Sequence, residues 1–160
     1  MSVYHMQKKE REIKNRERWI DILRHSKYTT VAMCRNNEPY VVTLSCGFDE
    51  AENTLYFHSA QKGLKMEFLN DNPEVCATII QDKGYKKGKC AHSYRSLVFW
   101  GKMTLVNDLE EKKRGLDILL NHLEEEPGRL KKRLLKDDKS YAGLGVLKLE
   151  ISRITGKQGQ

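Results

Sequence analysis

The segment from Leu55 to Lys65 limits the possible folds more than any other part of this chain. Residues 54–58 have the composition of a β-strand, and a helix is expected directly afterwards, over residues 61–69. Ser59 stands at the junction and is a residue type that caps helix N-termini, so the first backbone N–H groups of the helix should be free to bind an anion. The junction is therefore a candidate anion site at the end of a strand.

Two lysines strengthen this interpretation. Lys62 and Lys65 are three residues apart, so they would be neighbours on the helix surface, and both side chains would lean towards the helix N-terminus. Gly63 would let a ligand approach closely. Strand-to-helix junctions also carry serine and lysine without any ligand, so this segment alone leaves a phosphate site and a purely structural junction equally open.

The rest of the chain predicts short strands joined by turns. Two of them should form a hairpin around Asn36-Asn37, and a short exposed helix should follow Pro127-Gly128. The expected order is helix 7–25, strands 28–34, 40–46 and 54–58, helix 61–69, strand 74–81, a loop over 82–89, strand 92–106, helix 109–123 and strand 143–154. The chain contains no dinucleotide-binding or P-loop glycine motif. The sequence therefore predicts a mainly β (α+β) fold, a small mixed β-barrel with peripheral helices.

The composition fits a single domain over residues 1–160, with a charged N-terminal helix region, 1–18, at its periphery. No apolar run approaches the ~20 residues that a membrane helix needs, and residues 1–18 lack the apolar centre of a signal peptide. We therefore expect a cytoplasmic protein without a membrane partner. Neither a metal site nor a disulfide is expected, because the cysteines are scattered without a ligand spacing. They are Cys34, Cys46, Cys76 and Cys90.

The net charge of +7 permits an anionic partner, either a nucleic acid or a phosphorylated small molecule. The basic residues form three clusters, which lie within residues 8–18, 83–89 and 129–136. None has the interleaved aromatic residues of a single-strand binder, nor a DNA-reading motif. A nucleic-acid partner is therefore disfavoured, although a basic nucleic-acid-binding module remains an alternative.

Four segments in a fixed order resemble a known family. They are YVVTLS at 40–45, YFHSAQKGLK at 56–65, NPEVC at 72–76 and YRSLVFWG at 94–101, and ISRITGK at 151–157 closes the series. This series resembles the pyridoxamine 5'-phosphate oxidase-related flavoproteins, in particular their nitroimidazole-resistance (Nim-like) branch. The resemblance implies an FMN-binding split β-barrel, and a homodimer that binds FMN at its interface.

The resemblance also implies roles for individual residues. Strand 40–45 would run along the isoalloxazine ring. The strand-to-helix junction at Ser59 would hold the ribityl chain and phosphate, and Ser96 would supply a polar flavin contact. The implied cofactor-binding residues are Val42, Thr43, Leu44, Ser45, His58, Ser59, Ala60, Lys62, Lys65, Arg95 and Ser96. The oxidase itself has Ser-Arg-Lys where this chain has Gly63-Leu64-Lys65, and its substrate-binding C-terminal segment has no counterpart here. Oxidation of vitamin B6 is therefore not expected.

The expected function is an FMN-dependent oxidoreductase that reduces small electron-poor molecules, of the nitro or quinone type, by hydride transfer through flavin N5. His58 is the one titratable group in the motif, either a proton donor or a structural histidine that bonds a backbone carbonyl, and the absence of a partner in the sequence favours the structural role. The alternative function is flavin binding without turnover, for storage or electron relay. The sequence does not name the substrate or the reductant, and it leaves deazaflavin or haem open as cofactors.

Overall fold

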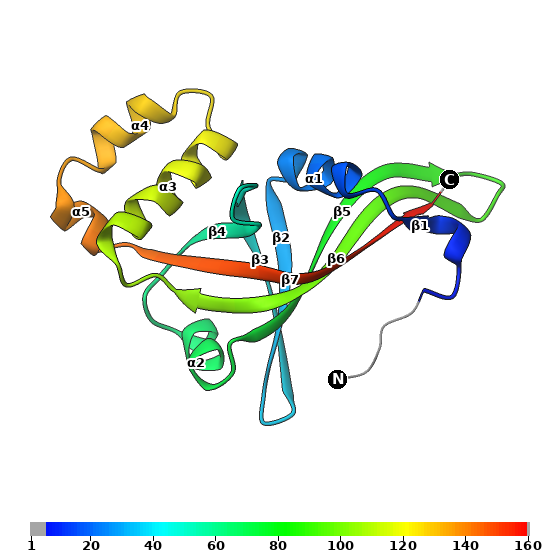
Figure 1. Cartoon of the computed structure of the whole chain (residues 1–160), viewed down its shortest axis with the longest axis horizontal. Helices are drawn as coiled ribbons and strands as arrows, with labels where there is room; N and C mark the ends of the chain where they lie inside the picture. Colours follow the sequence, from blue (N-terminus) through cyan, green and yellow to red (C-terminus); the bar gives the residue numbers. More distant parts are fainter. Residues whose placement is uncertain (1–5, 160) are drawn as a thin grey trace.

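The computed structural model describes residues 6–159 as a closed antiparallel β-barrel with helices around it (Figure 1). The seven-stranded sheet has the order β1-β7-β4-β3-β2-β5-β6, and pairing of β6 with β7 closes it. The strands are β1 (Glu12–Ile13), β2 (Tyr28–Arg35), β3 (Glu38–Asp49), β4 (Thr54–Ser59), β5 (Glu74–Lys86), β6 (Ala91–Leu105) and β7 (Gly145–Gly159). The helices are α1 (Arg16–His25), α2 (Leu64–Asp71), α3 (Leu109–Leu123), α4 (Pro127–Leu134) and α5 (Asp138–Ala142), with a 3₁₀ turn at Lys9–Arg11.

Alternation along the strands builds the core. On β2, Val31 and Met33 are buried, whereas Ala32 and Cys34 between and beside them are exposed, as expected for a strand with one face on the core. Most of the barrel interior is aliphatic and aromatic, and Phe57, Phe68 and Phe99 are fully buried in it. The predicted β-barrel with peripheral helices is confirmed, but every pairing in it is antiparallel rather than mixed.

Local sequence signals set two of the bends. Asn36 and Asn37 have φ of 48° and 66°, the left-handed conformation that a tight hairpin turn needs, and they join β2 to β3 as predicted. The register between β6 and β7 shifts at Gly101, a residue type that often marks a bulge inside a strand. A side chain on Gly101 would collide with the backbone carbonyl of Glu150 on β7.

Helix α3 has the predicted bounds and lies directly on the outer surface of β3 and β4. Asp108 caps it by accepting a hydrogen bond from the backbone N–H of Glu111 at 2.8 Å. Glycines at the contact allow the close approach: a side chain at Gly115 would meet the ring of Tyr56, and one at Gly47 would meet the backbone of α3. Helices α4 and α5 continue from α3 and form, with it, a helical layer at one end of the barrel (Figure 1).

Several predicted elements differ from the structure, and β3 extends beyond its predicted bounds at both ends. The first helix begins at Arg16, where Asn15 caps it, and not at residue 7; the residues before it form the 3₁₀ turn and β1. The loop predicted over residues 82–89 is mostly a two-stranded extension of β5 and β6, because pairing resumes after an irregularity between Asp82 and Tyr85. The last strand continues to Gly159, since its C-terminal half pairs with β6. Within residues 6–159, no helix combines the length and apolar character that a bilayer crossing requires.

Candidate functional site

The junction after β4 differs from its prediction in detail. Helix α2 begins at Leu64, and Gly63 precedes it with φ of 117° and ψ of 176°, a conformation that strongly favours glycine. The predicted capping role of Ser59 is wrong, because Ser59 is the last residue of β4 and its hydroxyl donates to the carbonyl of Ala60 at 2.9 Å. The helix therefore starts without a side-chain cap, and Lys62 lies in the loop before it.

The N-terminus of α2 presents donors that the protein itself does not use. Within residues 6–159, the backbone N–H groups of Leu64 and Lys65 make no hydrogen bond, as expected for the first residues of a helix. In the same part of the chain, no carboxylate forms an ion pair with Lys62 or Lys65. Burial lowers the pKa of the half-buried Lys65. An anion would satisfy these amides and stabilise the protonated lysine, so the predicted anion site has the donors it requires.

Hydrogen bonds hold the junction loop in place. Gln61 donates from Nε2 to the carbonyls of Ala142 and Leu144, at 2.8 and 3.0 Å. The buried Lys112 on α3 donates from Nζ to the same Leu144 carbonyl at 2.9 Å. The loop is thus fixed to the beginning of β7 and to α5. No local pattern indicated this arrangement, because the carbonyls belong to a segment that lies far away in the chain.

Helix α2 is also fixed at its side, against the β2–β3 hairpin. The rings of Tyr40 and Phe68 lie 5.1 Å apart between centroids, and the guanidinium of Arg35 lies 4.5 Å from the centroid of Phe68. Arg35 also forms ion pairs with Glu67 and Asp71 on α2, at 3.6 and 3.7 Å. Both contacts hold the helix end beside β3, so the candidate anion site is attached to rigid elements.

Strand β3 brings an open polar edge to this junction. Its ladder with β4 ends at the pair Cys46↔Phe57, so the edge of residues 40–45 that faces β4 has no strand partner within residues 6–159. Thr43 and Ser45 are exposed on the outer face. Val42 and Leu44 pack against the core, and only their backbone groups are available to a ligand. A planar heteroaromatic ring could bond to this edge.

His58 lies beside Ser45 on the outer face of the barrel. The pair Cys46↔Phe57 places Ser45 and His58 at the next position, where the strands separate. The ring of His58 is exposed and makes no hydrogen bond to the described residues, so the structural role favoured from the sequence has no support in the contacts. Both side chains line a cavity of about 660 Å³. Its other lining residues are Leu116, Leu119, Leu120, Leu123, Leu130, Leu134, Leu135, Ser140 and Leu144.

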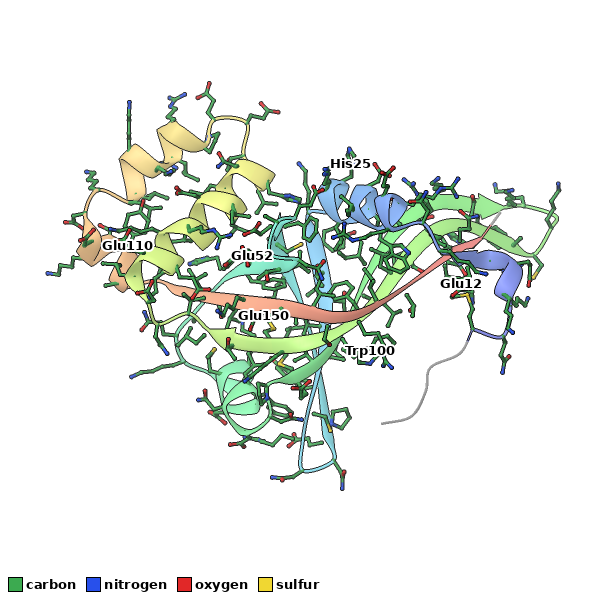
Figure 2. All side chains as sticks on the ribbon, viewed as in Figure 1. Glu12, His25, Glu52, Trp100, Glu110 and Glu150 are labelled. Carbon is green, nitrogen blue, oxygen red and sulfur yellow. The ribbon has the colours of Figure 1, made fainter. Side chains whose placement is uncertain are left out.

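Two predicted site residues, Ser96 and Arg95, lie away from the junction in the structure. Ser96 is on the outer face of β6 and pairs with Ile80, whereas Ser45 on β3 pairs with Tyr28. Strands β2 and β5 lie between the two serines. At ~4.8 Å per strand, this arrangement separates the serines by roughly 14 Å. Arg95 has its Nη1 3.1 Å from Oδ2 of Asp21 on α1. Helix α1, which carries His25 in Figure 2, lies at the opposite end of the barrel from α2. Within one chain, neither Arg95 nor Ser96 joins the site at Lys65 and His58.

Comparisons with known proteins agree with this architecture. A sequence model of the family described as pyridoxamine 5'-phosphate oxidase matches residues 15–158. A candidate 5-nitroimidazole antibiotic resistance protein from Bacteroides thetaiotaomicron superposes with a TM-score of 0.75 at 28% identity, over 92% of this chain and 86% of that one. No curated protein matches the chain.

Two further structures show the same fold at lower identity. The flavocytochrome Anf3 from Azotobacter vinelandii has a TM-score of 0.78 at 18% identity, over 97% of this chain and 72% of that one. The FAD and heme binding protein from Mycobacterium smegmatis has a TM-score of 0.76 at 20% identity, over 94% of this chain and 74% of that one. The split-barrel fold and the family resemblance predicted from the sequence are confirmed.

Proposed function

This chain belongs to the pyridoxamine 5'-phosphate oxidase family, and on that premise we propose that it is an FMN-dependent reductase of small electron-poor organic molecules. One observation carries the proposal. The candidate anion site at the start of α2, the open polar edge of β3 and the cavity beside His58 all adjoin the region where β3 and β4 separate. Such an arrangement matches the phosphate, the ring and the reaction space that a flavin reductase needs.

The residues fit FMN in one orientation. The phosphate would bind to Lys65 and to the N–H groups at the start of α2, with Lys62 and the backbone of Ser59 and Ala60 nearby. The isoalloxazine ring would lie along residues 42–45, where Ser45 offers its hydroxyl group and Val42 and Leu44 offer backbone groups. The Thr43 hydroxyl, which also lies there, is already hydrogen-bonded to the Thr30 hydroxyl at 2.9 Å. The end of the ring would then reach His58 and the cavity.

Bound FMN would supply hydride transfer through N5. The chain's own residues would do the rest. The β3 edge orients the ring, the cavity leucines exclude water from the reacting atoms, and His58 donates a hydrogen bond or a proton to an oxygen of the acceptor. His58 can do this because its ring has no bond to another described residue.

We further infer a homodimer, because the outer face of β2, β3, β5 and β6 is apolar and exposed. Tyr28, Val41 and Ile80 are 61%, 58% and 60% exposed on this face, which marks an interaction surface. Rows of small and apolar side chains cross it, Val41–Ala32–Cys76–Trp100 and Thr43–Thr30–Thr78–Val98. A second copy on this face could bring its own Ser96 and Arg95 towards the cofactor of the first, which accounts for their separation from Lys65 within one chain.

The absorbance spectrum of the purified protein tests the cofactor. We expect flavin bands, and a released cofactor whose mass is that of FMN. A mass matching FAD, a deazaflavin or haem would replace FMN in the proposal. FAD and haem are alternatives because a structure with the same fold is named for FAD and haem binding. A protein without flavin absorbance that also fails to take up added FMN would refute flavin binding.

Flavin binding without turnover is the second candidate function, since His58 has no acid–base partner among residues 6–159. The two functions differ in a half-reaction experiment. In a reductase, a nicotinamide cofactor bleaches the flavin band under anaerobic conditions, and an added quinone or nitro compound restores it within the turnover time. In a storage protein, the band does not bleach, or bleaches without reoxidation by the acceptor.

A further inference from the structure

We propose that the cavity beneath α3, α4 and α5 binds the substrate, an apolar molecule that presents a carbonyl or nitro oxygen to Ser45 and His58 at one end. This inference rests on the proposed reductase function and specifies its substrate class. The remainder of the molecule would lie among the leucines of the helical layer.

The cavity has the size and lining of a small-molecule site. Its volume of about 660 Å³ falls in the range of ligand pockets, roughly 300–1,000 Å³. Leucines of α3 and α4 form most of its wall, together with Leu135 and Leu144 from the segments that follow α4 and α5. Ser140, the polar residue on the helical side, is already engaged, because its hydroxyl donates to Oδ1 of Asp137 at 2.6 Å. Ser45 and His58 are therefore the available polar groups, and they fix the end at which a substrate oxygen would bind.

Polar contacts outside the cavity keep the helical layer over it. Lys131 on α4 pairs with Asp117 on α3 at 2.6 Å, and Lys113 on α3 pairs with Asp138 on α5 at 2.8 Å. Protein interiors contain few voids larger than a water molecule. A leucine-lined space of this volume, bounded by helices that are fixed from outside, fits a bound molecule better than a packing defect.

Charge also favours an electron acceptor in this space. Among the described residues that line the cavity, none is acidic. Reduction of a quinone or nitro group places negative charge on its oxygen, which a nearby carboxylate would oppose and the His58 ring can stabilise or protonate. Leu134 on α4 is 57% exposed although it lines the cavity, so it marks the mouth through which an apolar molecule enters.

Binding of an uncharged fluorescent probe, N-phenyl-1-naphthylamine, tests the pocket without any turnover. Leu120→Trp would fill the cavity from α3, and Asn121→Trp adds the same bulk at the exposed neighbouring position. We expect Leu120→Trp to weaken probe binding at least tenfold and Asn121→Trp to leave it unchanged. Leu134→Asp, at the exposed mouth where folding is not at risk, should weaken binding as well. Unchanged probe binding in both Leu120→Trp and Leu134→Asp would overturn the proposal.

A series of 2-alkyl-1,4-naphthoquinones tests the same pocket during turnover. Each methylene that enters the cavity should lower KM about fourfold, as expected for burial of a CH₂ group, with little change in kcat. Leu120→Trp should remove this dependence on chain length while unsubstituted benzoquinone is still reduced. A KM that does not depend on chain length in the wild-type protein would refute the pocket but not the reductase. Probe binding without any flavin uptake would refute the reductase and leave an apolar binding site.

Discussion

Gln61 and Lys112 donate to the same oxygen, the carbonyl of Leu144, from the junction loop and from α3. This shared acceptor connects the anion site to the helical layer that covers the cavity. We predict that Gln61→Ala lowers the free energy of unfolding by about 1 kcal/mol, because two hydrogen bonds are lost at a partly hydrated position. Gln61→Glu, which keeps the shape but cannot donate, should be at least as harmful. Urea unfolding measures the effect, with the exposed Gln7→Ala as the control.

The same substitution should also weaken FMN binding, since the loop that Gln61 holds precedes the α2 anion site. If Gln61→Ala lowers stability but leaves the dissociation constant for FMN unchanged, the loop is not part of the phosphate site.

Lys65 is predicted to carry most of the side-chain contribution to phosphate binding. Lys65→Ala should weaken FMN binding by about 1–3 kcal/mol, the usual cost of losing a charge-assisted hydrogen bond. Lys62→Ala should have a smaller effect, because Lys62 is exposed in the loop and not part of the helix. Fluorescence titration of the apoprotein with FMN measures both, and the exposed Lys102→Ala on β6 is the control. Equal affinity of Lys65→Ala and the wild type would place the phosphate elsewhere.

Binding of FMN should depend on pH at the alkaline end. Burial lowers the pKa of Lys65, so the free protein loses this charge at a lower pH than an exposed lysine does. As the pH rises through that lowered pKa, the protonated form that attracts the phosphate disappears, and affinity for FMN should fall. Lys65→Arg should extend strong binding to higher pH, because a guanidinium stays protonated throughout this range. An identical alkaline profile for the wild type and Lys65→Arg would exclude Lys65 as the titrating group.

The sequence predicted the parts of the fold that depend on local signals. The Asn36-Asn37 turn and the bounds of α3 were both evident, because turn residues and a leucine stripe act within a few positions. The start of α2 was misplaced, because a serine can either end a strand or cap a helix. Ser59 pairs with Gly145 on β7, and this pairing makes it the end of β4. That pairing joins residues far apart in the chain and leaves no local pattern.

The candidate site was also predictable from the sequence only in part. The lysines and the hydroxyl residues of β3 could be read from the sequence, whereas the cavity could not, because its wall combines α3, α4, α5 and the residues Ser45 and His58. The leucines at 130, 134 and 135 follow helical spacing and would have indicated an apolar face on α4. Nothing local indicated that this face covers a space rather than a packed core.

Cys46 should behave as an inert thiol. It is fully buried, and burial raises the pKa of its thiol from 9.0 to about 11. At pH 8, alkylation followed by mass spectrometry should label the exposed Cys34 and Cys90 and leave Cys46 unlabelled until the protein unfolds. The raised pKa also makes stability fall as the pH rises from 9 towards 11, because the unfolded state releases this proton first. Cys46→Ala should lose that part of the pH dependence, and labelling of native Cys46 at pH 8 would contradict the assignment.

Ile80 tests the proposed dimer. It is 60% exposed and lies between Tyr28 and Ser96 on the apolar outer face. We predict that Ile80→Glu converts a dimer to a monomer in light scattering, because each interface would have to bury a carboxylate without a partner. Leu134→Glu is the control for light scattering alone, since Leu134 is similarly exposed, at 57%, but belongs to α4. If Ser96 enters the cofactor site of a second copy, Ile80→Glu should also weaken FMN binding. A monomer that keeps wild-type affinity for FMN would show that one chain forms the whole site.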